Sequence, residues 1–207
     1  MEFSQVLKKQ LSKYMPTGLV VYMRNWETDY TGDWKPAGKP LALLLHHTAS
    51  CATQSKSAKA PGNQKGANNG TINYIQNHYD VPAANFTLDR DGTLYVHAAN
   101  PVWHAGLGTF QGKPPWDTLK IPDDEGNRYM LGVEIMSQGK IEDYTAAQEK
   151  SLALLIDACA AAGGWEPLWL KNRPRHKDWT TRKIDILYSN EEVKEWVAQY
   201  GAKPVTA

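Results

Sequence analysis

The spacing of apolar and polar residues divides the chain into helices, strands and polar connections. In the first fifteen residues the apolar side chains lie three or four positions apart, which predicts an amphipathic helix that ends near Pro16. The strongest helix is predicted over 145–162, with Thr145 as its N-cap and Gly163-Gly164 at its end. Shorter helices are predicted over 71–79 and, capped by Asn190, up to Tyr200.

The predicted strands are short runs of apolar residues. Leu41–Leu45 is apolar on both faces and ends at His46, which is typical of a central strand covered on both sides. Residues 85–88 and 93–96 flank a turn in which Gly92 supplies the positive backbone angle of a hairpin. Further strands are predicted over 18–24 and 131–136.

Strands interleaved with helices predict an α/β fold with a single central mixed β-sheet flanked by helices. Two polar segments, 50–70 and 107–129, are predicted to be long loops. The length of 207 residues, 42% of them hydrophobic, suits one well-buried domain. We expect a helix and strand extension at 1–40, the main domain at 41–200 and a tail or linker at 201–207.

Composition argues against several classes of protein. The chain has 23 basic and 22 acidic residues without a basic cluster, so we expect no nucleic-acid partner. The longest apolar run, Leu41–Leu45, is far shorter than the roughly 20 residues of a membrane span. The first residues show no signal-peptide pattern, and we expect synthesis in the cytoplasm. Cys51 and Cys159 form neither a disulfide framework nor a two-cysteine zinc motif.

Two histidines and an aspartate are placed to bind a metal ion. His46 ends a buried strand, and His176 and Asp185 lie nine residues apart in a segment long enough to bend both side chains towards one ion. A lone histidine is more often packed or exposed than metal-bound. Two histidines and one carboxylate, however, match the three protein ligands of a catalytic zinc. His47 is the weaker candidate, because neighbouring strand residues point to opposite faces.

A carboxylate interrupts the apolar strand at 131–136. Burial of Glu134 without a partner would be costly, so a structural role would require a nearby arginine, for which Arg90 or Arg128 is available. We favour a catalytic role, because water activated by a metal needs a base beside it. Lys183 would add a positive charge where an oxygen becomes negative; the alternative is a solvated loop lysine.

Five short motifs follow one another between about residues 40 and 186, over roughly seven tenths of the chain. They are His46-His47-Thr48, Asn85-Phe86 with Asp89-Arg90-Asp91-Gly92, Trp103-His104-Ala105-Gly106, Gly132-Val133-Glu134-Ile135, and His176 with Arg182-Lys183-Ile184-Asp185. Each motif alone is a weak signal. As an ordered set they resemble the zinc-dependent N-acetylmuramoyl-L-alanine amidases related to peptidoglycan recognition proteins.

This resemblance implies a substrate, a cofactor and a mechanism. The substrate would be bacterial peptidoglycan, cleaved at the amide between N-acetylmuramic acid and the L-alanine of the stem peptide. The metal ligands would be His46, His176 and Asp185, holding Zn²⁺. Glu134 would act as the base that takes a proton from water, and Lys183 would stabilise the oxyanion. Substrate binding is expected from four further residues: Trp103, His104, Asn85 and His47.

One departure from the family pattern bears on the mechanism. Some members place a catalytic tyrosine just before the position of Asn85, where this chain has Ala84. The version of the mechanism that depends on glutamate is therefore favoured over the one assisted by tyrosine.

The form of the last motif, from His176 to Asp185, also resembles phage endolysins. We therefore expect a monomeric endolysin that accumulates in the host cytoplasm and reaches the wall through a holin-like path. The alternatives are a cytoplasmic wall-recycling amidase and a peptidoglycan-binding module without activity.

Overall fold

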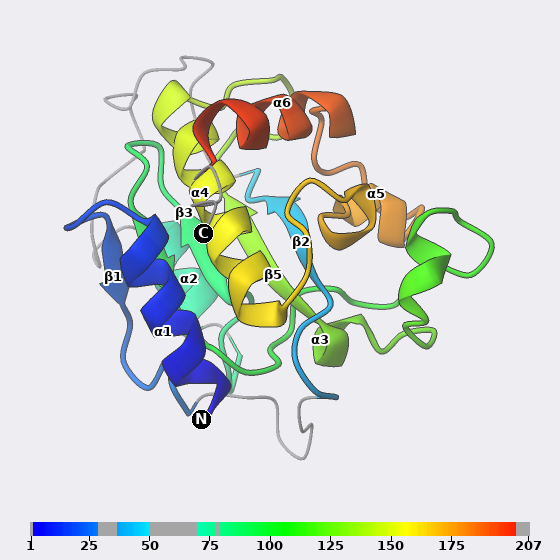
Figure 1. Cartoon of the computed structure of the whole chain (residues 1–207), viewed down its shortest axis with the longest axis horizontal. Helices are drawn as coiled ribbons and strands as arrows, with labels where there is room; N and C mark the ends of the chain where they lie inside the picture. Colours follow the sequence, from blue (N-terminus) through cyan, green and yellow to red (C-terminus); the bar gives the residue numbers. More distant parts are fainter. Residues whose placement is uncertain (1, 29–36, 50–69, 78, 202–207) are drawn as a thin grey trace, which may run out of the picture.

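A five-stranded β-sheet forms the centre of the molecule (Figure 1). The computed structural model describes residues 2–28, 37–49, 70–77 and 79–201. The strand order is β1-β4-β3-β5-β2, so the strand that ends at His46 lies at the edge of the sheet, and its predicted central position is wrong. Among the described strands only β3 and β4 pair in antiparallel fashion, so the predicted mixed sheet is confirmed. The strands are β1 (Val20–Tyr22), β2 (Ala42–His47), β3 (Phe86–Leu88), β4 (Leu94–Val96) and β5 (Met130–Ile135).

Three helices pack on one face of this sheet: α1 (Phe3–Tyr14), α4 (Ala146–Gly163) and α6 (Asn190–Tyr200). Figure 1 shows α1 and α4 side by side in front of the strands, with α6 across the end of α4. The short helix α2 (Gly70–Asn77) lies behind the sheet in this view. The predicted 1–40 extension thus contributes α1 to the core and β1 to the edge of the sheet.

Helix α4 begins and ends where the sequence predicted. The Thr145 side chain accepts a hydrogen bond from the backbone of Gln148, whose own side chain accepts from the backbone of Thr145. At the other end, Gly164 adopts a left-handed conformation with φ of 81°, which ends the helix. The predicted cap of α6 is wrong by one residue, because Ser189 forms the equivalent capping box with Glu192.

The two faces of the sheet carry different side chains, because neighbouring strand residues point in opposite directions. Leu43 and Leu45 of β2 lie in the large core with α1, α4 and α6. Leu44 faces the other way, into a smaller core that contains Trp179. His46, two residues after Leu44, points to the same face as Leu44 and is paired in register with Glu134 of β5. The helices therefore stabilise one face and leave the opposite face for polar groups.

The prediction of a long polar loop at 107–129 is wrong. This segment contains the 3₁₀ helix η1 (Trp116–Leu119) and the short helix α3 (Gly126–Tyr129), and it buries Phe110 and Ile121 in the smaller core. The Lys113 ammonium also donates to the carbonyl oxygens of Asp178 and Trp179. The few apolar residues of this segment follow no regular spacing, so the sequence pattern did not reveal that they pack.

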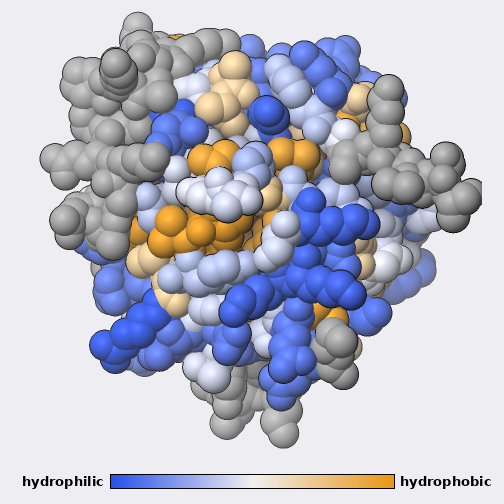
Figure 2. Space-filling view, turned by 60° about the vertical axis from the view of Figure 1, so that its left-hand side comes forward, coloured by the Kyte–Doolittle hydropathy of each residue, from blue (hydrophilic) through white to orange (hydrophobic). Residues whose placement is uncertain are grey.

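Other sequence predictions concern residues outside the described ranges: Cys51, the loop at 50–70 except Gly70, and the tail at 202–207. Cys159 is buried in α4, and burial raises the pKa of its thiol, so it packs as an apolar residue. Within the described residues, no helix is long and apolar enough to cross a membrane. Figure 2, turned so that the β1 side comes forward, shows hydrophobic residues gathered in the middle of this face.

Candidate metal centre

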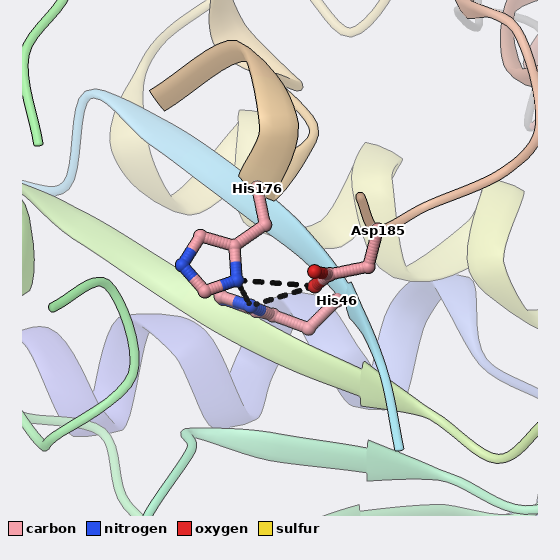
Figure 3. Close-up of side chains that lie close together, drawn as sticks. All are labelled: His46, His176 and Asp185. Carbon is pink, nitrogen blue, oxygen red and sulfur yellow. Dashed lines mark hydrogen bonds and ion pairs between the residues drawn. The ribbon is translucent and has the colours of Figure 1, made fainter. Parts of the chain in front are cut away.

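Three predicted ligands meet at the end of β2 (Figure 3). His46 lies on β2, His176 is the first residue of the short helix α5 (His176–Trp179), and Asp185 follows in the next loop. The Nδ1 atoms of the two histidines are 2.9 Å apart. The Asp185 Oδ2 atom lies 3.1 Å from Nδ1 of His176 and 3.5 Å from Nδ1 of His46. All three residues are buried.

Backbone contacts fix the segment that carries His176 and Asp185. The Leu45 N–H donates to the carbonyl oxygen of Pro174 at 2.9 Å, which attaches the segment to β2. The Lys177 N–H donates to the Asp185 carbonyl oxygen at 2.8 Å, which folds the segment back on itself. Side chains add to this, because the Arg175 guanidinium forms a bidentate pair with Asp178 across α5. The predicted single loop thus contains a helix that presents one of the ligands.

The charges of the three groups are set by burial and by their contacts with one another. Burial lowers the pKa of the His46 imidazole to about 4, and the nearby His176 acts in the same direction, so His46 is neutral. Burial alone would raise the pKa of the Asp185 carboxyl. Contacts with the His176 and His46 rings outweigh burial and hold this pKa below its usual value. Asp185 is therefore an anion beside a neutral ring.

These donor atoms fit a zinc ion. A carbonyl oxygen only accepts, so the contact of 3.1 Å between Nε2 of His176 and the Ala105 oxygen places the proton on Nε2. With that proton on Nε2, the His176 ring directs the lone pair of Nδ1 towards Asp185 and His46, where a bound cation would accept it. In a tetrahedral zinc site, ligand atoms are about 3.3–3.6 Å apart, similar to the separations found here.

Glu134 lies beside this cluster without a structural partner. It is partly buried on β5, and its buried Oε2 has no hydrogen-bond partner among the described residues. Burial raises the pKa of its carboxyl to about 8, Asp185 adds to the increase, and Lys183 partly opposes it. The two arginines considered as structural partners bind other carboxylates: Arg90 pairs with Asp143, and Arg128 with Glu125.

A groove opens from the metal ligands to the surface, with a volume of about 1030 Å³ among the described residues. Glu134, His176 and Asp185 line its floor. Its rim carries three exposed aromatic side chains, Tyr74, Tyr79 and Trp103, and three cations, Lys140, Arg182 and Lys183. Arg182 was identified only as part of the last motif, and Tyr74, Tyr79 and Lys140 were not predicted, because surface residues of helices and loops carry no periodic signal.

Of the four residues predicted to bind substrate, three line the groove and one does not. Trp103 and His47 line the groove, and their contact with substrate stays a prediction. His104 also reaches the groove, but both of its ring nitrogens already have protein partners. The structure places Asn85 outside the groove, because its buried amide donates to the carbonyl oxygens of Ala98 and Asn100.

Comparison with known proteins gives one matching family and several solved structures with a similar fold. A family model described as N-acetylmuramoyl-L-alanine amidase (Amidase_2) matches residues 36–186. No curated protein sequence matches the chain.

Three similar solved structures have TM-scores just above 0.5. AmpD is 18% identical, with a TM-score of 0.51 over 86% of this chain and 99% of its own. The endolysin LysCS from Clostridium intestinale is 18% identical, with a TM-score of 0.52 over 86% of this chain and 95% of its own. The Staphylococcus aureus hydrolase AmiA is 15% identical, with a TM-score of 0.51 over 95% of this chain and 90% of its own. At these identities, the likeness shows a shared fold.

We predict that the purified protein binds one zinc ion per chain and that Asp185→Ala reduces zinc affinity by at least tenfold. The substitution removes the anionic ligand and leaves two neutral imidazoles. Elemental analysis and competition with a chromophoric chelator would measure this. Asp80→Ala, which removes an exposed aspartate, is the matched control and should bind zinc like the unchanged chain. Equal zinc affinity in the two variants would contradict the site.

Proposed function

The chain belongs to the N-acetylmuramoyl-L-alanine amidase family, and from this premise we propose that it is a zinc-dependent amidase of bacterial peptidoglycan. It would cleave the amide between N-acetylmuramic acid and the L-alanine of the stem peptide. The observation that supports this best is the meeting of His46, His176 and Asp185 beside the buried carboxyl of Glu134 at the floor of an open groove. Zinc held by these three side chains would supply a Lewis acid and make water more acidic.

Glu134 is suited to move the proton. Its carboxyl lies on a rigid strand, in register with His46 on the neighbouring strand, so its distance from the ligands is fixed by the sheet. Burial raises its pKa to about 8. The charge of a zinc ion held beside it would lower this pKa towards neutrality, where a carboxylate can take a proton from water and keep it until the amine leaves. Glu134 would then pass this proton to the nitrogen of L-alanine, and the amide bond would break.

Lys183 is suited to stabilise the negative oxygen of the tetrahedral intermediate. It lines the groove, and its positive charge is close enough to influence the pKa values of both His46 and Glu134. A positive charge next to a developing oxyanion lowers the barrier to its formation.

The rim of the groove matches the chemistry of peptidoglycan. Aromatic rings such as those of Tyr74, Tyr79 and Trp103 stack on the apolar faces of sugars and on peptide backbone. Lys140 and Arg182 provide positive charge for the carboxylates of an acidic stem peptide. Both kinds of group lie within reach of the ligands, as an amide that joins a sugar to a peptide requires.

We further propose that the protein acts as a monomeric phage endolysin, made in the host cytoplasm and admitted to the wall through a holin-like path. The fold is shared with the endolysin LysCS, and the open groove would admit a polymeric glycan strand. A wall-recycling amidase would act on small soluble muropeptides instead. The two roles differ in whether intact walls are a substrate.

The proposed function predicts which bond of peptidoglycan is cleaved. Incubation with purified peptidoglycan should release intact stem peptides that begin with L-alanine and leave uncut glycan strands. Mass spectrometry of the products would identify the bond. New reducing ends would indicate a glycosidase, and shortened stem peptides would indicate a peptidase. Wall binding by the zinc-loaded protein without any product would support the alternative of a binding module.

The role of Glu134 leads to a second prediction. Glu134→Gln should lower kcat about 10²- to 10⁴-fold, because the amide cannot accept a proton, while zinc content stays the same. The matched control is Glu142→Gln, which makes the same change at an exposed position. Ordinary turnover by Glu134→Gln would remove this residue from the role of base.

The proposed biological role predicts the timing of lysis. Bacteria that express the protein should continue to grow until chloroform opens their inner membrane, and their optical density should then fall within minutes. Cells that express Glu134→Gln are the control and should keep their optical density. If purified protein cleaves soluble muropeptides but leaves intact sacculi unchanged, a recycling enzyme is the correct interpretation.

A further inference from the structure

A further histidine, His104, lies directly behind the proposed metal ligand His46. Its Nδ1 is 3.3 Å from Nε2 of His46, and its Nε2 is 3.0 Å from the carbonyl oxygen of Met130. The two rings meet edge to face, with an interplanar angle of 85°. His104 is 8% exposed, so these contacts are shielded from bulk water. His104 therefore connects a metal ligand to the backbone of β5.

The Met130 carbonyl oxygen determines which ring nitrogens of His104 and His46 carry protons. The Met130 oxygen only accepts, so the proton of His104 is on Nε2. The Nδ1 of a neutral His104 then bears a lone pair and accepts from the Nε2–H of His46. With its proton on Nε2, His46 directs the lone pair of Nδ1 towards His176 and Asp185. A different tautomer of His46 would present an N–H to the metal.

We infer that His104 is a positioning residue that fixes the tautomer and orientation of His46 and so controls how firmly zinc is retained. The inference rests on the proposed zinc site. It departs from the expectation that His104 binds substrate, because both ring nitrogens are already used within the protein. Partners of this kind, outside the ligand shell of a metal, typically change metal affinity by about 10- to 100-fold.

Two neighbouring residues hold His104 in place. The Asn127 side-chain oxygen accepts from the backbone N–H of His104 at 3.0 Å and from that of Ala105 at 2.7 Å. Gly132 provides the space for the ring. A Cβ atom at position 132 would lie 2.4 Å from both Cγ and Nδ1 of His104, which is much closer than packed atoms approach. The glycine of the Gly132-Val133-Glu134-Ile135 motif is therefore explained by the histidine that packs against it.

The test compares zinc release from three variants of the zinc-loaded protein into an excess of chelator. His104→Leu removes the acceptor for His46 and should release zinc about 10 to 100 times faster than the unchanged chain. His104→Asn keeps an oxygen near the position of Nδ1 and should restore part of the loss. The control is His97→Leu, since His97 is also buried with both nitrogens bonded, to Thr87 and Gln76, but contacts no ligand. Its zinc release should be unchanged.

A second variant and an NMR measurement test the role of His104 independently. If His104→Leu does not fold, as judged by circular dichroism, Gly132→Ala should also release zinc faster, because its methyl group displaces the His104 ring. Nitrogen-15 NMR of the unchanged zinc-loaded protein should show the His104 proton on Nε2 and none on Nδ1.

The possible outcomes separate this inference from the proposed function. Wild-type release rates in both His104→Leu and Gly132→Ala, or a proton on Nδ1 of His104, would overturn the positioning role while leaving a zinc amidase intact. An unchanged chain that binds no zinc would overturn both. Peptidoglycan left uncut by a zinc-loaded chain whose variants lose zinc as expected would overturn only the proposed function.

Discussion

The constraint on which the rest of the structure depends is the burial of three polar metal-binding groups beside one another. His46, His176 and Asp185 place lone pairs within 3.5 Å of one another in a region without bulk water. Burying such groups together is costly, so the surrounding chain must hold each of them in place. Much of the local structure serves this purpose: the attachment of Leu45 to Pro174, the Arg175–Asp178 pair and the bond from His176 to Ala105.

Because the sheet has two different faces, the apolar core on one face offsets the free-energy cost of burying this polar cluster on the other. The face towards α1, α4 and α6 buries a large apolar core that includes Leu43, Leu45 and Val133. At about 25 cal/mol for each Å² of apolar surface removed from water, this face supplies most of the driving force for folding. The opposite face can then carry His46 on the edge strand β2 and Glu134 on the neighbouring β5, although both are unfavourable to bury. Stability and chemistry are provided by alternate residues of the same strands.

Sequence reasoning succeeded where the signal is local and periodic. Buried strands placed His46 and Glu134, and capping residues bounded α4, because each follows from a few neighbouring residues. The packing of Phe110 and the second role of His104 could not be predicted in this way. Both depend on contacts between residues far apart in the chain, such as the bond between His104 and Met130, and no local pattern encodes them. The motif Trp103-His104 indicated that the residue matters but not what it contacts.

The residues that would carry out the reaction and the residues that would select the substrate lie on different parts of the structure. Paired strands lie about 4.8 Å apart, so the spacing between His46 and Glu134 is a property of the backbone ladder. The groove walls, in contrast, come from α2 and from the connections that carry Trp103, Lys140 and Arg182. Changes in these connections would therefore alter the substrate contacts without moving His46 relative to Glu134. The sheet sets the distance between the reacting groups, and the connections set the shape of the groove that leads to them.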